Sequence, residues 1–166
     1  WVFQHNGFYY STWTGYSKLE GRKVANLSDL LHALPVTIFE PKAGQPYSRH
    51  LWSPKIYHFS AEEVGAANAG WYLYLSANDG SGRSALNHRL FVLRSLTDDP
   101  IGPYGSPQDG TLDTPVPVTS ARKNVFNDEW VAGPKVLKYG GRNFLIWVGR
   151  VGGPESANIG DHWQCL

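Results

Sequence analysis

Residues 52–59 have the sequence WSPKIYHF, and residues 70–77, a short distance further on, have the sequence GWYLYLSA. Both runs are rich in aromatic residues, and glycine, proline and asparagine lie in or beside them, a pattern typical of β-strands joined by a turn. A tryptophan begins the first run and a glycine begins the second. This order of tryptophan, apolar strand, glycine turn and aromatic strand decides the fold, because it occurs again elsewhere in the chain.

The same order of features occurs near both ends of the sequence. Trp1 begins WVFQHNGFYY, with Gly7 at the expected turn, and Trp130 begins WVAGPKVL, which is followed by GRNFLIW from Gly141. A further strand is expected after each of the first two occurrences, at residues 23–29 and 91–98, whose ends read LSD and LTD. A repeating block of about four antiparallel strands is the unit of a β-propeller. We therefore expect an all-β chain with blade-like units at about 1–48, 49–125 and 126–166.

The length of the chain limits how much of a propeller it can form. The repeat is longer than the roughly 40 to 50 residues per blade of the common interaction propellers, so the loops between strands should be long. At this spacing the 166 residues hold about two and a half blades, whereas closed propellers have at least about four. We expect the sequence to be part of a larger protein. Helical periodicity is confined to residues 27–34, which Pro35 ends.

Composition excludes several kinds of partner. The chain has 15 Lys and Arg against 14 Asp and Glu, a net charge of +1, so no nucleic acid partner is expected. Apolar runs such as residues 144–148 are far shorter than the roughly 20 residues of a membrane span, so no membrane partner is expected. The single cysteine, Cys165, excludes an internal disulfide. The six histidines have no short metal-ligand spacing, and neither a metal nor a cofactor is expected.

Two tryptophans are candidate binding residues. Trp52 should lie at the inner end of the first strand of its unit, near the axis where propellers bind ligands, and an aromatic face there can stack on the apolar face of a sugar ring. The alternative is that Trp52 caps the core of a blade. Trp13, just after the aromatic strand of the first unit, is a second candidate platform. Ser53, which follows Trp52, completes the predicted substrate-binding set.

The carboxylates matter because sugar hydrolysis requires two of them. Asp128 and Glu129 immediately precede Trp130 and are the best placed to lie near an axis. The remaining candidates are surrounded by glycine and proline, where an aspartate commonly accepts a turn-forming hydrogen bond from the backbone. These are Asp79, Asp98, Asp99, Asp109 and Asp113.

Several of these segments together resemble glycoside hydrolase family 43. The segment from Trp1 to Tyr10 is similar to that family's Asp-Pro-Trp-Val opening from the tryptophan onward, and residues 51–57, LWSPKIY, resemble its Leu-Trp-Ala-Pro-Glu signature. Residues 70–77 resemble its Gly-Lys-Trp-Tyr-Leu-Tyr-Tyr-Ser-Ala strand, and residues 87–95 and 99–104 resemble the strand and turn that follow. The resemblance implies a five-bladed β-propeller and a secreted, inverting α-L-arabinofuranosidase-like or β-xylosidase-like enzyme. Its expected substrate is an arabinose- or xylose-containing plant polysaccharide.

The departures from the family pattern concern the catalytic carboxylates. The family's general base would precede Trp1, and its general acid would follow Leu166. The carboxylate that tunes the acid falls on Ala132 or Gly133, depending on the alignment, and the glutamate of the signature is Lys55. The resemblance therefore implies a glycosidase whose catalytic carboxylates this chain lacks, so we expect the chain to be inactive alone. The alternatives are a non-catalytic carbohydrate-binding propeller and an interaction propeller.

Overall fold

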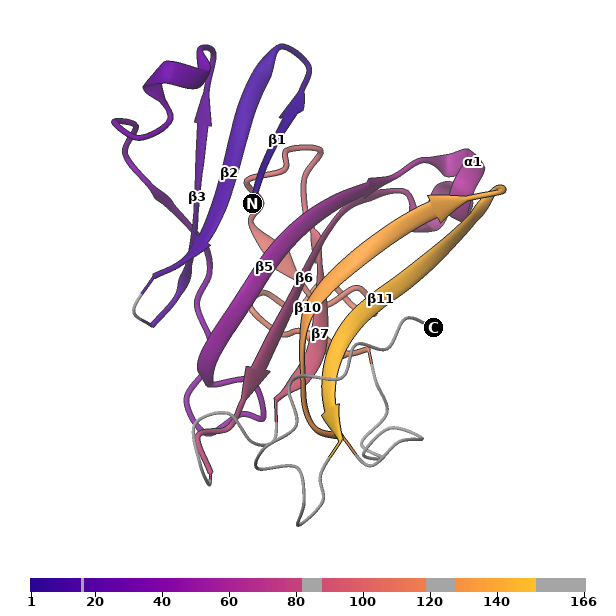
Figure 1. Cartoon of the computed structure of the whole chain (residues 1–166). Helices are drawn as coiled ribbons and strands as arrows, with labels where there is room; N and C mark the ends of the chain where they lie inside the picture. Colours follow the sequence, from indigo (N-terminus) through magenta and orange to yellow (C-terminus); the bar gives the residue numbers. More distant parts are fainter. Residues whose placement is uncertain (16, 82–87, 119–127, 152–166) are drawn as a thin grey trace.

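The computed structural model describes residues 1–15, 17–81, 88–118 and 128–151, and within these ranges the regular secondary structure is almost entirely antiparallel β-sheet (Figure 1). The first sheet has the strand order β1 (Val2–His5), β2 (Phe8–Thr14), β3 (Leu19–Val24) and β4 (Val36–Phe39). The second sheet has the order β5 (Arg49–Phe59), β6 (Gly70–Asn78), β7 (Arg89–Ser95) and β8 (Tyr104–Gly105), with β9 (Val116–Pro117) also paired to β7. The third sheet pairs β10 (Asp128–Tyr139) with β11 (Arg142–Val151). The all-β prediction is confirmed, whereas the number of blades and the boundaries of the units stay predictions.

Two of the three predicted glycine turns are tight hairpins. Asn6 and Gly7 join β1 to β2 with φ angles of 48° and 80°, and Gly140 and Gly141 join β10 to β11 with φ angles of 56° and 72°. A two-residue hairpin of this kind requires positive φ at both central positions, which glycine and asparagine tolerate best. The turn predictions at Gly7 and Gly141 are therefore confirmed.

The prediction that Gly70 forms the turn is wrong. The segment between β5 and β6 contains a short helix, α1 (Ala61–Val64), and a 3₁₀ turn, η2 (Ala66–Asn68), and Gly70 is instead the first residue of β6. Ser60 and Glu63 form a capping box in which each side chain accepts a hydrogen bond from the other residue's backbone N–H. This pair favours a helical turn in the segment that connects β5 to β6, before Gly70.

The third strand of the first sheet also differs from its prediction. Residues 23–29 were expected to form it, but β3 ends at Val24, and residues 27–29 form a 3₁₀ turn, η1 (Leu27–Asp29). The Gly15 N–H donates to the Lys18 carbonyl at 2.8 Å, so the chain reverses soon after β2 and β3 begins earlier than expected. The helical stretch predicted at 27–34 is thus reduced to η1.

The main core lies between the first and second sheets. Leu19 and Ile38 of the first sheet pack with buried residues of the second, including Ile56, Leu73 and Leu93. Additional aromatic contact comes from Phe3, whose ring centroid is 5.7 Å from that of Trp71. The two sheets are therefore joined by the burial of apolar side chains face to face rather than by backbone pairing.

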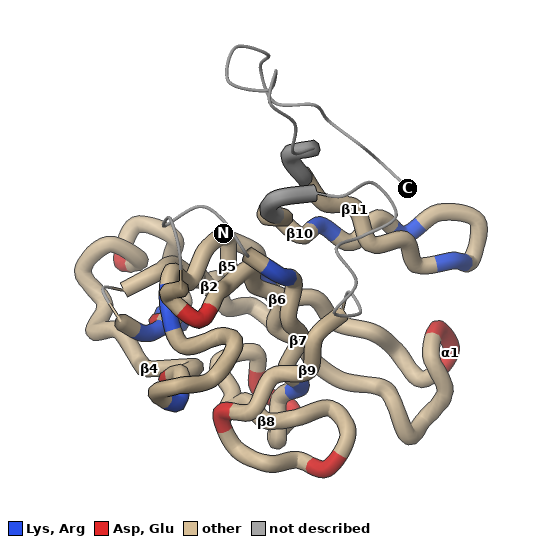
Figure 2. The backbone as a smooth tube through the Cα atoms, turned by 90° about the horizontal axis from the view of Figure 1, so that it is seen from below, with Lys and Arg blue, Asp and Glu red and all other residues tan. Residues whose placement is uncertain are grey.

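The third sheet lies against the other face of the second sheet (Figure 1 and Figure 2). The Ser76 hydroxyl, opposite Trp52 in the β5–β6 register, donates to the Val131 carbonyl of β10. Further along, the Lys138 ammonium donates to the His58 carbonyl at 2.8 Å. Val131 thus lies beside the level of Trp52 and Lys138 beside His58. The two contacts have the same order along both strands, so β10 runs alongside β5 in the same direction. The described residues thus form separate sheets packed in series, as successive propeller blades do.

Candidate functional site

Strand β5 is irregular on both sides of Trp52. Its pairing with β6 shifts register between Arg49 and Trp52 and again between Trp52 and Lys55. Within these two bulges, His50 and Ser53 have φ angles of 49° and 52°. A left-handed backbone costs a non-glycine residue about 1–2 kcal/mol, and such strain is concentrated at functional sites. Bulges re-aim side chains beside binding sites, so the geometry of β5 marks Trp52 as a candidate.

A cavity of about 670 Å³ opens at this end of β5. Its lining combines an aromatic ring, a guanidinium, an imidazole and two hydroxyls, and it consists of Thr14, Arg49, His50, Leu51, Trp52 and Ser53. Because Thr14 ends β2, the cavity lies where the first and second sheets meet. Its volume is within the usual range of roughly 300–1,000 Å³ for small-molecule sites.

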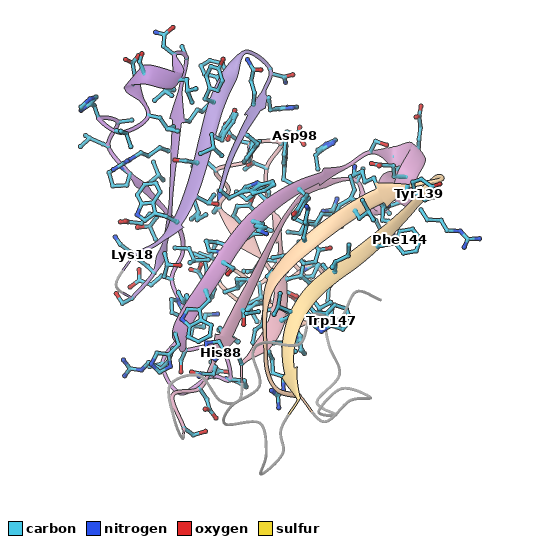
Figure 3. The ribbon with its side chains drawn as sticks, in the orientation of Figure 1. Lys18, His88, Asp98, Tyr139, Phe144 and Trp147 are labelled. Carbon is cyan, nitrogen blue, oxygen red and sulfur yellow. The ribbon has the colours of Figure 1, made fainter. Side chains whose placement is uncertain are left out.

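The ring of Trp52 is held in place by His88. The two ring centroids are 3.7 Å apart and the rings are inclined by 18°, so they stack. His88 is fully buried next to β7, and Figure 3 labels it near the start of β5. Its Nε2 lies 2.9 Å from the His50 carbonyl, and Nδ1 of His50 lies 2.9 Å from the Asn78 side-chain oxygen. This network covers one face of the indole and leaves the rest of it to line the cavity.

The structure brings together two of the three predicted substrate-binding residues. Trp52 and Ser53 both line the cavity. Trp13 does not: the Thr12 hydroxyl donates to the Pro54 carbonyl of β5, so the next residue, Trp13, points to the opposite face of the first sheet. There the Arg22 guanidinium lies 4.4 Å from the centroid of the indole. Binding of substrate by Trp13 stays a prediction.

Sequence reasoning missed the residues that complete and support the cavity, namely Thr14, Arg49, His50, Asn78 and His88. His50 lies two positions before Trp52, so its place in the sequence could have suggested it. His88 has no comparable local signal, because the antiparallel pairing of β6 with β7 brings it to Trp52.

The positions predicted for the tuning carboxylate lie in a bulge of β10 that matches the bulge of β5. The register of β10 with β11 shifts between Ala132 and Lys135, and Gly133 has a φ angle of 62°. The sequence Gly-Pro-Lys at 133–135 corresponds to Ser-Pro-Lys at 53–55. Ala132 therefore occupies the place of Trp52, and neither Ala132 nor Gly133 carries a charge.

The other predicted positions are only partly covered. Asp128 and Glu129 begin β10, but their side chains lie outside the described part of the structure, as does Leu166. Trp1 precedes β1, and its amino group donates to the Thr12 carbonyl at 3.0 Å. The ring centroid of Trp1 is 5.7 Å from that of Tyr57 on β5.

Most of the aspartates that were expected to accept turn-forming hydrogen bonds from the backbone do so. Oδ1 of Asp79, Asp99 and Asp109 accepts a hydrogen bond from the backbone N–H two residues later, at 2.7 Å, 2.9 Å and 2.9 Å. Hydrogen bonds from Ser81 lower the pKa of Asp79, and those from Thr111 lower the pKa of Asp109. Asp113 instead accepts from the Glu40 backbone, and burial raises its pKa. These four carboxylates are engaged in loop structure.

The described ranges contain neither a metal-binding cluster nor a membrane-spanning helix. No three histidine, cysteine, aspartate or glutamate side chains there are grouped so that they could hold a metal ion. No helix in the same ranges has the length and apolar character needed to cross a membrane.

Comparison with solved structures shows that this fold is known. The chain is similar to an alpha-L-arabinofuranosidase from Lactobacillus brevis, with a TM-score of 0.66 and 18% sequence identity. The match covers 90% of this chain and 43% of that chain, so the present sequence spans less than half of its structural relative. No family model matches the sequence. No curated protein matches it either. The chain therefore has the fold of part of a glycosidase.

Proposed function

We propose that this chain is part of a secreted, inverting glycoside hydrolase of the α-L-arabinofuranosidase type, a five-bladed propeller that acts on arabinose- or xylose-containing plant polysaccharides. The likeness to an arabinofuranosidase supports the part of this proposal that concerns the fold. In it, the described sheets are neighbouring blades, and the cavity beside Trp52 binds sugar.

The observation that carries the proposal is the placement of Trp52. A sugar ring presents an apolar face of C–H groups and a rim of hydroxyls, so its binding site needs an aromatic platform beside hydrogen-bonding groups. His88 stacks on Trp52 and fixes its orientation. Arg49 and Ser53 line the same cavity and supply donors and acceptors for sugar hydroxyls. Pre-orientation of the platform reduces the entropy that binding would otherwise cost.

The chain alone should bind sugar without cleaving it. Inverting hydrolysis requires two carboxyl groups about 6.5–9.5 Å apart. The described lining of the cavity includes no aspartate or glutamate. Ala132 and Gly133 stand where the family resemblance expects a carboxylate. In this proposal the catalytic carboxylates belong to other parts of the complete propeller.

The exposed face of the third sheet is consistent with further blades. The side chains of Leu137, Tyr139 and Phe144 are 45%, 77% and 37% exposed, and Figure 3 shows the two aromatic ones on β10 and β11. An apolar sheet face of this kind is usually covered by another element. In the proposal, the next blade of the ring covers it.

A second candidate is a non-catalytic sugar-binding propeller. The uncharged residues Ala132 and Gly133 favour it, as does Lys55, a cation where the family signature has a glutamate. Both candidates share the binding site at Trp52, and they differ in whether the complete protein hydrolyses the bound sugar.

Fluorescence titration tests the shared part of both proposals. Arabino- and xylo-oligosaccharides should quench the tryptophan emission of the chain, and the same mixtures should contain no released arabinose or xylose. The Trp52→Ala variant should lose binding, whereas Trp147→Phe, which removes an indole from β11, should retain it. Absence of binding by the unaltered chain would refute the proposed function. Release of free sugar would refute the expected inactivity.

A further inference from the structure

A second, smaller cavity adjoins the cavity beside Trp52. Its described lining consists of Ser17, Glu40, Pro41, Ala43, Gly44, Ser48 and Arg49, and it is called the Glu40 cavity below. Arg49 also lines the cavity beside Trp52. The connection between β2 and β3 borders both cavities, the larger one through Thr14 and the smaller one through Ser17. The two cavities are therefore neighbours at the end of the sheets where β2 ends and β5 begins.

The Glu40 cavity is small for an independent binding site. Small-molecule sites usually have volumes of roughly 300–1,000 Å³. The cavity beside Trp52, at about 670 Å³, is within this range, whereas the Glu40 cavity, at about 210 Å³, is below it. A space of this size next to a larger site fits one further part of the same ligand.

The polar groups of the Glu40 cavity suit the hydroxyls of a sugar. The Glu40 carboxylate can accept hydrogen bonds from neighbouring hydroxyls, the Arg49 guanidinium can donate hydrogen bonds to them, and the hydroxyl of Ser48 can do either. In the described part of the chain, the ion pairs involve neither Glu40 nor Arg49. Both charged groups are exposed and are available to a ligand.

The segment that joins β4 to β5 forms most of the wall of the Glu40 cavity and is held firmly in place. Tyr47 in this segment is buried, and its ring centroid lies 6.1 Å from that of Phe39 and 5.7 Å from that of Phe91. The Glu40 backbone N–H donates to Oδ1 of Asp113 at 3.2 Å. A wall anchored in this way is preorganised, which lowers the entropy cost of binding.

Arg49 lies between the two cavities. Its stem passes over Gly80, where a Cβ would be 2.8 Å from Cγ of Arg49, so the glycine leaves room for this stem. The guanidinium has five N–H donors in one plane. These donors are available to the hydroxyls of a ligand that occupies both cavities.

From this juxtaposition we infer that the Glu40 cavity is a second sugar subsite, so that the chain binds an oligosaccharide across Arg49 rather than a single sugar residue at Trp52. The inference rests on the proposed function, because it extends the sugar site at Trp52. It narrows the ligand class to oligosaccharides with a residue whose hydroxyls pair with Glu40 and Arg49.

Calorimetric titration of the 166-residue chain with sugars of different length tests the subsite. The ligands are arabinose and arabinotriose, with xylose and xylotriose as a second pair. The trisaccharide is long enough to reach from Trp52 into the Glu40 cavity, whereas the monosaccharide occupies one site at a time. The trisaccharide should bind about tenfold or more tightly, because a hydrogen bond to a charged group contributes at least this much.

Matched variants make the test specific. Ala43→Phe should fill the Glu40 cavity from its exposed wall and remove the gain, and Glu40→Gln should reduce the gain severalfold. Both should leave monosaccharide affinity unchanged. Ala66→Phe and Glu62→Gln make the same substitutions at exposed positions beyond the other end of β5 (Figure 1) and should change neither affinity. Circular dichroism would show that each variant keeps its sheets, and Glu40→Gln decides the test if Ala43→Phe does not fold.

The remaining outcomes separate this inference from the proposed function. Equal affinity for the two sugar lengths, or a gain that survives the substitutions at Ala43 and Glu40, would overturn the inference and leave the proposed function standing. An equal loss of monosaccharide and trisaccharide binding in these variants would also overturn it, because the Glu40 cavity would then not be a separate subsite. Failure of every sugar to bind the unaltered chain would overturn the proposed function itself.

Discussion

Replacement of Leu73 by alanine should strongly destabilise the chain, because this side chain lies at the centre of the packing between the first and second sheets. Leu73 on β6 is fully buried, is paired with Ile56 and Leu93 on the neighbouring strands, and belongs to the main core cluster. Truncation of a buried leucine costs about 2–5 kcal/mol, from lost burial and the cavity that remains. We expect a loss of about 3 kcal/mol, because sheets packed face to face cannot readily collapse into the space.

Urea unfolding followed by tryptophan fluorescence measures this loss. With a slope of about 2 kcal/mol per molar urea, the midpoint should fall by about 1.5 M. Leu137→Ala provides the matched control: the same substitution on the outer face of β10, where the side chain is 45% exposed, should cost about 0.5 kcal/mol or less. A cost at Leu73 no greater than that at Leu137 would refute the packing of the first two sheets around one core.

Three further predictions follow from particular contacts. Gly21→Val should destabilise the chain by about 1–3 kcal/mol in thermal unfolding. The reason is that a Cβ at this position would lie 3.1 Å from Cγ2 of Ile38. Unchanged stability would contradict the close approach at this glycine. The pKa of His58 is lowered, mainly by burial. The folded state therefore favours the neutral imidazole, and this preference should contribute fully to stability above about pH 6.5. The contribution should be lost as the pH falls below that value. His58→Gln should therefore flatten the pH dependence of the melting temperature between pH 7.5 and 5, and an unchanged profile would rule out this histidine as the cause. The salt bridge between Lys138 and Glu63 spans 2.7 Å and is partly exposed, so a double-mutant cycle of Lys138→Ala and Glu63→Gln should give a coupling of about 0–1 kcal/mol; a much larger coupling would show that this pair, rather than apolar packing, attaches the third sheet.

Most strands could be predicted from the sequence because their signals are local. Short runs rich in aromatic and other apolar residues identified β2, β5, β6 and β11, and the glycines at positions 7 and 141 identified two hairpin turns. The failures have local causes as well. The capping box at Ser60 and Glu63 starts α1 between β5 and β6, so the chain turns before Gly70 rather than at it. An early chain reversal at Gly15 moves β3 toward the N-terminus.

The candidate site could be predicted only in part, because its geometry depends on contacts between strands. The tryptophan at position 52 was identifiable from its place in the repeat. Its stacking partner His88 was not, because the pairing of β6 with β7 brings the two rings together. The face occupied by Trp13 was equally hidden, since it follows from the hydrogen bond between Thr12 and Pro54 on different sheets. Positive φ at Ser53 gives no pattern in the sequence.

The central claim is that a sugar stacks on Trp52, and nuclear magnetic resonance tests it most directly. In ¹H–¹⁵N spectra the seven tryptophans each contribute an indole N–H resonance, and the one missing from the Trp52→Ala spectrum belongs to Trp52. On titration with an arabinose- or xylose-containing oligosaccharide, that resonance should shift more than any other indole signal and saturate with the binding curve. An unmoved Trp52 signal, with all shifts confined to other tryptophans or with no shifts at all, would contradict the account.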